Sequence, residues 1–145
     1  MDVREQINAL WTEFSRLEEV YRDFAGRYGL SIAELGILHE AWFAEYTTQK
    51  SVCELFSSPK QIVYKACRQL LDLGWIRTEK SADDGRYQKI YLTSLGVQKA
   101  GPIVTEFASM ERTIFLKLGE EDCRQLIRLM KKMSETAAEV MEDEQ

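Results

Sequence analysis

The sequence is poor in the residues that build catalytic and metal sites. Its 145 residues include one histidine, two prolines and three cysteines. Cys53, Cys67 and Cys123 are widely spaced and never form a C-x-x-C arrangement, so neither a disulfide framework nor a zinc site is indicated. No glycine-rich loop follows a strand pattern, and no nucleophile is paired with a base. We therefore expect no enzymatic activity, no cofactor and no metal.

Long apolar runs are also missing. No stretch approaches the roughly 18 residues of a membrane span, and no basic segment followed by an apolar one stands at the N-terminus. We expect a cytoplasmic protein without a membrane partner. A chain of this length is sufficient for one domain of ordinary size.

The chain as a whole has no excess of positive charge. The net charge of −5 disfavours a nucleic-acid partner, because phosphate binding needs positive potential. The charge is segregated, however: residues 47–91 carry eight basic and five acidic side chains, whereas the two ends are acidic. This asymmetry is expected where only one face meets a polyanion, although surplus charge on a solvated surface is the alternative.

The N-terminal third predicts two helices. Apolar or aromatic residues recur every three or four positions over residues 7–28 in a heptad-like stripe, and Gly29 then provides a left-handed stop. Ser31 and Glu34 form a capping box for a second helix that reaches Trp42.

The central segment predicts a helix-turn-helix. Thr47 or Thr48 can cap a short helix. The serine-serine-proline run at residues 57–59 predicts a hydroxyl cap and a proline in the first turn of a further helix, which reaches Leu73 and stops at Gly74. Two short helices joined by a tight polar turn are typical of this motif.

A hairpin and two long helices complete the expected order. Residues 75–80 and 87–92 have strand composition, and the SADDG run between them has turn chemistry. Thr93 caps a long helix that the Gly101-Pro102 pair should bend, and a last helix begins near Gly119.

The helix after Pro59 has two chemically different faces. On a wheel of about 100° per residue, its polar side chains fall within about 140° of one another. They are Lys60, Gln61, Tyr64, Lys65 and Arg68. The opposite side, which we expect to pack on the domain, carries Ile62, Val63, Ala66, Cys67, Leu70 and Leu73.

This polar face suits duplex DNA. An α-helix fits the major groove, where Gln reads adenine, Lys or Arg reads guanine, and the same cations bind phosphate. Water is the alternative partner, since most amphipathic helices have a solvated side.

The hairpin favours the DNA interpretation. Its turn carries Arg86, with Lys80 and Lys89 on the adjoining strands. A basic extension beside a groove-sized helix can reach the neighbouring minor groove, whose negative potential attracts arginine. We expect the Asp84 carboxylate to accept hydrogen bonds from turn amides or from Arg86, which would aim the guanidinium.

The order of these elements resembles the MarR family of winged helix-turn-helix transcription regulators. The resemblance covers nearly the whole chain and is strongest over residues 31–96. It is carried by TTQKSVCELF, by SSPKQIVYKACRQLLDLGWI, by Asp84-Gly85-Arg86 matching the family's D-x-R, and by Leu92-Thr93-x-x-Gly96. The pattern L-x-x-x-D/E-x-x-x-L from Leu118 onward is also similar.

The resemblance implies a mainly α fold with a small β-hairpin wing. Residues 1–30 and 94–145 would supply dimerisation helices, and residues 31–93 would form the DNA-binding lobe. An obligate homodimer would place two recognition helices, residues 58–73, in successive major grooves of a pseudo-palindromic operator, as a repressor. The implied DNA-binding residues are Ser58, Lys60, Gln61, Tyr64, Lys65, Arg68, Asp84, Arg86 and Lys89.

Many relatives bind small aromatic or anionic effectors, and others sense oxidants through cysteine. A candidate effector pocket would be lined by Trp11, Phe14, His39, Trp42, Phe43 and Phe107. Aromatics at helical spacing are more often core residues. Redox sensing through Cys53 or Cys67 is an alternative, but it requires a thiolate, and inert packing of the thiols is favoured.

A winged-helix module that binds protein is the principal rival, because a fold does not fix a function. Such a module should expose apolar or acidic residues on the recognition helix. This sequence places Lys60, Lys65 and Arg68 there instead.

Overall fold

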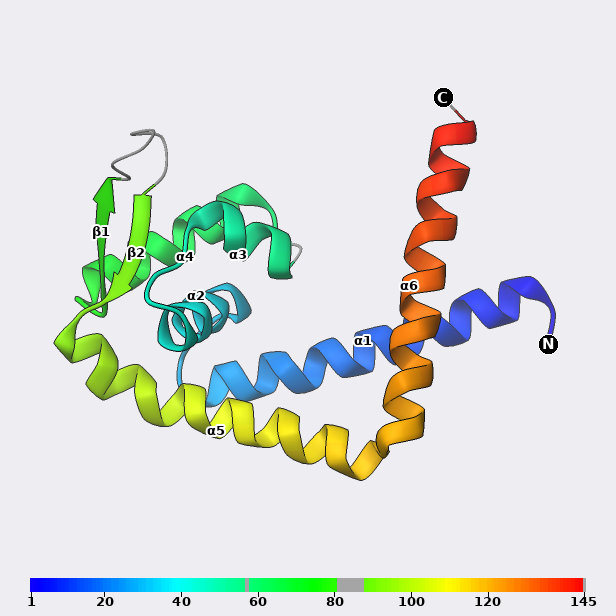
Figure 1. The fold of residues 1–145 in the computed structure, drawn as a ribbon, viewed down its shortest axis with the longest axis horizontal. Helices are drawn as coiled ribbons and strands as arrows, with labels where there is room; N and C mark the ends of the chain where they lie inside the picture. Colours follow the sequence, from blue (N-terminus) through cyan, green and yellow to red (C-terminus); the bar gives the residue numbers. More distant parts are fainter. Residues whose placement is uncertain (57, 81–87, 145) are drawn as a thin grey trace. The chain divides into compact units, whose positions relative to one another are not determined.

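The computed structural model describes residues 1–56, 58–80 and 88–144, and these ranges form six helices and two strands (Figure 1). The helices are α1 (Val3–Arg27), α2 (Ile32–Phe43), α3 (Gln49–Phe56), α4 (Lys60–Asp72), α5 (Ser94–Leu118) and α6 (Glu120–Asp143). The strands are β1 (Ile76–Lys80) and β2 (Gln88–Leu92). The expected mainly α fold with one hairpin is confirmed. In these ranges no helix has the length and apolarity needed to cross a membrane.

The chain divides into two compact units, Met1–Thr105 and Glu106–Gln145. The first unit holds α1 to α4, the hairpin and the first half of α5, and the second holds the rest of α5 and α6. The assignment of residues 1–30 and 94–145 to dimerisation and of residues 31–93 to DNA binding stays a prediction.

Local side-chain chemistry begins the first three helices. Asp2 caps α1 and Ser31 caps α2, each in a capping box completed by a glutamate three residues later. The Thr48 hydroxyl accepts a hydrogen bond of 3.1 Å from the amide of Ser51 at the start of α3. Gly29 has the left-handed φ of +70° that ends α1. The predicted starts of α2 and α3 are therefore confirmed, with Thr48 rather than Thr47 as the cap.

The antiparallel pair β1 and β2 lies beside α4 in the first unit (Figure 1). Its register places Ile76 opposite Leu92 and Lys80 opposite Gln88. The connection between α2 and α3 adds a bridge to this sheet, where the Thr47 amide bonds the Ile90 carbonyl at 3.0 Å and the reverse bond measures 2.7 Å. The largest fully buried side chains all belong to this unit: Ile37, Leu38, Leu70, Ile90, Val52, Val63 and Val104.

The two long C-terminal helices begin as predicted. The Thr93 hydroxyl accepts a hydrogen bond of 2.9 Å from the Gly96 amide at the first turn of α5. Gly119, with φ of +92°, precedes α6, whose first turn holds three acids that favour the helix dipole. Pro102 lies inside α5, and the bend expected there stays a prediction.

Candidate nucleic-acid interface

Helix α4 turns one narrow face to the core and the rest to solvent. Its buried residues are Val63, Ala66, Cys67 and Leu70. The arc that these four positions define is centred almost opposite Gln61 and Lys65. All five predicted polar residues are exposed: Lys60, Gln61, Tyr64, Lys65 and Arg68. The structure thus brings these five side chains onto one solvent-facing surface.

The apolar side of α4 is narrower than the helical wheel predicts. Ile62 and Leu73 were expected to pack inward, yet each side chain is 51% exposed. Both stand outside the arc of the four buried positions, one near each end of the helix. Ile62 therefore adds an apolar side chain to the exposed surface, one turn before Lys65.

The start of α4 also differs from its prediction. The helix begins at Lys60 rather than with Pro59 in its first turn, and Pro59 is an extended N-cap with ψ of 145°. The Pro59 carbonyl accepts bonds from the amides of Ile62 and Val63, at 3.0 and 3.2 Å. Ser58, the predicted cap, is half-buried and donates instead to the Phe56 carbonyl at 3.4 Å. Ser57, the other serine of the expected cap, lies outside the described residues.

The residues packed beneath α4 are apolar and fully buried. Val63 and Leu70 have no exposed surface, nor has Val52 of α3, which packs against α4. An interior of this kind is close-packed, so the exposed face has little freedom to rotate on it. The positions from which the polar side chains project are consequently fixed by the packing of the helix.

The C-terminal end of α4 is joined to the start of α5. Gly74, with φ of +75°, ends the helix, and its carbonyl accepts a bond of 2.6 Å from the Thr93 hydroxyl. The Thr93 amide bonds the Trp75 carbonyl at 3.0 Å. A Cβ added to Gly96 would lie 1.9 Å from that carbonyl oxygen, so only glycine permits this approach.

The two strands of the hairpin are described, but its tip is not. Asp84 and Arg86 lie outside the described residues, so their predicted roles stay predictions. Lys89 is half-buried on β2, and its Nζ lies 4.5 Å from the centroid of the Tyr46 ring. Lys80 is exposed at the end of β1.

The buried thiol of Cys67 is not activated. Burial raises the pKa of the Cys67 thiol to about 11, with a smaller contribution from Cys53, while a hydrogen bond with Gln49 acts in the opposite sense. A thiol of this pKa is protonated at neutral pH and is a poor nucleophile. Cys53 and Cys123 are half-buried. The Cys123 thiol lies 3.4 Å from the Phe115 carbonyl oxygen, to which it donates.

The candidate effector residues are found in local pairs. The rings of Trp11 and Phe14 lie 5.6 Å apart on α1, and those of His39 and Phe43 lie 4.8 Å apart on α2. Trp42 packs close to Gly101, where an added Cβ would lie 2.7 Å from its ring. Phe107, in the second unit, is buried. A single pocket formed by all six stays a prediction.

The described residues contain no group of three or more histidine, cysteine, aspartate or glutamate side chains that could hold a metal.

Known structures share this fold. A MarR family regulator from Neisseria meningitidis is 22% identical over the whole of both chains, with a TM-score of 0.84. AbsC, a MarR family transcriptional regulator from Streptomyces coelicolor, is 18% identical over 95% of this chain and 96% of its own, with a TM-score of 0.76. MepR from S. aureus, in a structure of its complex with DNA, is 19% identical over 90% of this chain and 97% of its own, with a TM-score of 0.71.

These structures establish that the chain has the winged-helix fold found in MarR family regulators. No protein-family model and no curated protein matches the sequence.

Proposed function

We propose that this protein is a sequence-specific, double-stranded DNA-binding transcriptional regulator that acts as a homodimer. The observation that carries the proposal is the outward face of α4, where Gln61, Lys65 and Arg68 stand opposite the buried side of the helix. These side chains have the chemistry for base edges and phosphates. The S. aureus MepR of the same fold is known in complex with DNA.

The position of each side chain suggests its role. Gln61 lies in the first turn of α4, and the N-terminal residues of a recognition helix contact base edges. Lys65 and Arg68 follow at the one-turn spacing that keeps them on the same side, where they neutralise phosphates or read guanine. Tyr64 flanks this line with a large exposed ring. Arg86 is assigned to the adjacent minor groove from the sequence alone.

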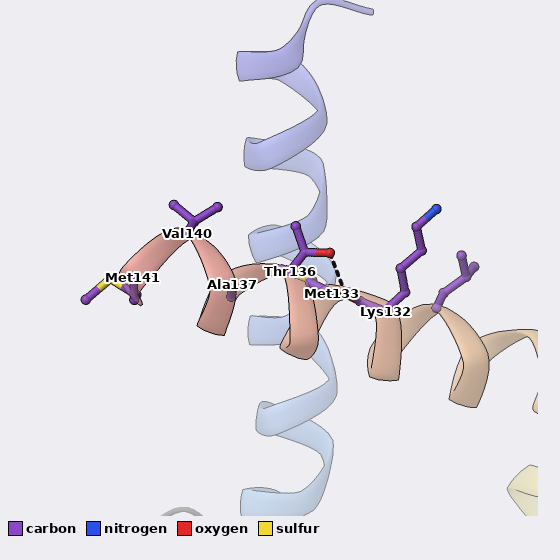
Figure 2. A pocket seen from close by; sticks show the side chains of 7 residues that line it. Lys132, Met133, Thr136, Ala137, Val140 and Met141 are labelled. Carbon is purple, nitrogen blue, oxygen red and sulfur yellow. Dashed lines mark hydrogen bonds between the residues drawn. The ribbon is translucent and has the colours of Figure 1, made fainter. Parts of the chain in front are cut away.

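Dimerisation is supported by apolar surface that the single chain leaves exposed. Helix α6 has no buried residue, yet it carries an apolar stripe. Figure 2 shows a groove on this helix lined by Leu129, Lys132, Met133, Thr136, Ala137, Val140 and Met141. On α1, the exposed apolar residues include Ile7, Leu10, Trp11, Leu17 and Val20. Exposed apolar surface of this extent is typical of an interface.

A twofold dimer determines the form of the DNA site. Two identical recognition helices require two half-sites related by pseudo-palindromic symmetry, centred about 10 bp apart or a multiple of that. Binding over a promoter would exclude polymerase, so repression is the expected outcome. Modulation by a small aromatic or anionic effector is a further expectation from the family resemblance.

The rival function, a winged-helix module that binds protein, would use the same surface differently. The three cations Lys60, Lys65 and Arg68 are exposed there, against one exposed acid on the helix, Asp72. A positive surface in a chain of net charge −5 favours a polyanion over an ordinary protein partner.

Selection of duplexes from a random DNA library tests the proposal. We expect enrichment of a pseudo-palindrome that the protein binds in gel-shift titrations. Lys65→Ala and Arg68→Ala should each reduce the slope of log affinity against log salt by about one unit, because each removes a phosphate contact. Lys131→Ala, which removes a cation from α6, is the matched control and should leave the slope unchanged. No enriched sequence would refute the function, and equal slopes for all four proteins would refute the assigned face of α4.

A further inference from the structure

The outer face of the wing sheet carries a run of cations and aromatic rings. Arg77 stands opposite Tyr91 in the register of β1 and β2, and Glu79 stands opposite Lys89. Ile90, between Tyr91 and Lys89, is buried. Because side chains alternate between the two faces of a strand, Lys89 and Tyr91 lie on the face turned away from the core.

A residue from outside the hairpin joins this face. The bridge between Thr47 and Ile90 is antiparallel, so it brings the preceding residue, Tyr46, alongside Tyr91. The centroids of the two tyrosine rings lie 5.8 Å apart, at an angle of 45°. Tyr46 belongs to the connection that leads from α2 directly into α3 of the helix-turn-helix.

Each tyrosine also holds a cation. The guanidinium carbon of Arg77 lies 4.4 Å from the centroid of the Tyr91 ring, and Arg77 is ion-paired with Glu79. The Lys89 ammonium lies 4.5 Å from the centroid of the Tyr46 ring. Both distances are within the range of a cation–π attraction. The four side chains Arg77, Tyr91, Tyr46 and Lys89 form a continuous series, here called the wing-base stack.

Two kinds of contact therefore tie the hairpin to the helix-turn-helix. On the inner side, the main chains of Thr47 and Ile90 are hydrogen-bonded and both residues are buried. On the outer side, the tie is made by side chains through Tyr46, which is 38% exposed. Since Tyr46 is not part of the core, its removal should change the orientation of the outer side chains more than the stability of the fold.

We propose that Tyr46 is a positioning residue for the wing, and this inference rests on the proposed DNA-binding function. Its ring holds Lys89 and, through Tyr91, the strand pair in one orientation relative to α3 and α4. The wing and the recognition helix are then presented to adjacent grooves as one preorganised surface. Less ordering entropy is lost on binding than with an untied hairpin.

Substitutions at Tyr46 test this role on a duplex selected from the random library. Tyr46→Ala should weaken binding of that duplex about three- to tenfold, because the ring contacts are lost. Tyr46→Phe keeps the ring and should bind within about twofold of the unsubstituted protein. Thermal unfolding and sedimentation of both variants should match those of the unsubstituted protein.

Repeating the Tyr46 substitution in a second variant of the protein distinguishes positioning of the wing from direct contact of Tyr46 with DNA. In a chain that carries Arg86→Ala and Lys89→Ala, the wing lacks the two cations assigned to DNA, so adding Tyr46→Ala should change affinity by less than about twofold. The same loss in both backgrounds, or a loss for Tyr46→Phe equal to that for Tyr46→Ala, would overturn the positioning role while leaving DNA binding intact. A protein that enriches no duplex would instead overturn the proposed function, and this inference with it.

Discussion

The Thr93 hydroxyl donates a hydrogen bond of 2.6 Å to the Gly74 carbonyl, 19 residues earlier in the chain, and accepts one of 2.9 Å from the Gly96 amide. One side chain thus satisfies the carbonyl of the glycine that follows α4 and a free amide at the start of α5. The two helices are held together at the point where the hairpin leaves and returns.

Replacing Thr93 by valine should lower the free energy of unfolding by about 1–2 kcal/mol, because two hydrogen-bonding groups lose their partner while the shape is kept. Thr93→Ser keeps the hydroxyl and should lose less than about half of that. Urea denaturation of the two variants measures the difference. No loss for valine, with a loss for serine, would show that the methyl group rather than the hydroxyl is what matters.

Gly96→Ala should be among the most damaging single substitutions in the chain. Its new Cβ would lie 1.9 Å from the backbone oxygen of Trp75. A backbone atom cannot move aside as the end of a flexible side chain can. We expect a loss of about 3 kcal/mol or more. Gly26→Ala is the control, since an added Cβ in α1 meets nothing within 4 Å and should be neutral or stabilising by up to about 1 kcal/mol. Comparable thermal midpoints for both variants would contradict the assigned contact.

The buried Cys67 thiol predicts a loss of stability at high pH. Its pKa is raised from 9.0 to about 11, so the unfolded chain loses this proton before the folded one does. The contribution of this thiol to the free energy of unfolding is fully present below pH 9 and is lost as pH rises through 11. The loss is roughly 2–3 kcal/mol at most.

The comparison with Cys67→Ala isolates that contribution from other groups that titrate at high pH. The stability difference between the two proteins should shrink steadily over this pH range. A difference that stays constant would mean that the thiol is not shielded from water. At pH 8, a thiol reagent should modify Cys53 and Cys123, which are half-buried, before Cys67.

Ile62 and Val63 are neighbours in sequence but should respond in opposite ways to truncation. Val63 has no exposed surface, and Val63→Ala should cost about 1–3 kcal/mol of stability with DNA affinity little changed. Ile62 is 51% exposed, so Ile62→Ala should change stability by less than about 0.5 kcal/mol and act on DNA binding instead. A large loss of stability for Ile62→Ala would mean that the helix buries that side.

A charge in the α6 groove should disrupt the proposed dimer. Met133→Glu would place a carboxylate in the apolar groove and should weaken dimerisation at least tenfold, since an unpaired buried charge costs several kcal/mol. Lys131→Glu puts the same charge on the opposite side of α6 and is the control. Sedimentation equilibrium distinguishes them. Removing α1 altogether would be less informative, because Phe24 and Ala25 are buried and the loss would damage the fold.

The ends of most elements could be predicted because they depend on local chemistry. The Ser31–Glu34 capping box, the Thr48 and Thr93 caps and the stop at Gly29 are each made within a few residues of the chain. The Ser58 cap was wrong for a local reason as well: Pro59 is extended, and its own carbonyl accepts the first amides of α4.

The helical wheel misplaced Ile62 and Leu73 because it treats a helix as uniformly covered along its length. Only the positions above the packed core are buried, and the extent of that core depends on α2, α3 and the sheet. Periodicity indicates which side of a helix is apolar. It does not indicate how far the neighbouring elements reach.

The sequence by itself determined the order of the helices and strands, most of their caps and stops, and the cations that share one side of α4. Those features follow from contacts between residues one helical turn apart. Only the tertiary structure decided that Tyr46 lies beside Tyr91 and that Thr93 bonds Gly74. Each of these contacts depends on segments far apart in sequence that are brought together by the burial of a shared core. Local sequence patterns do not predict such contacts.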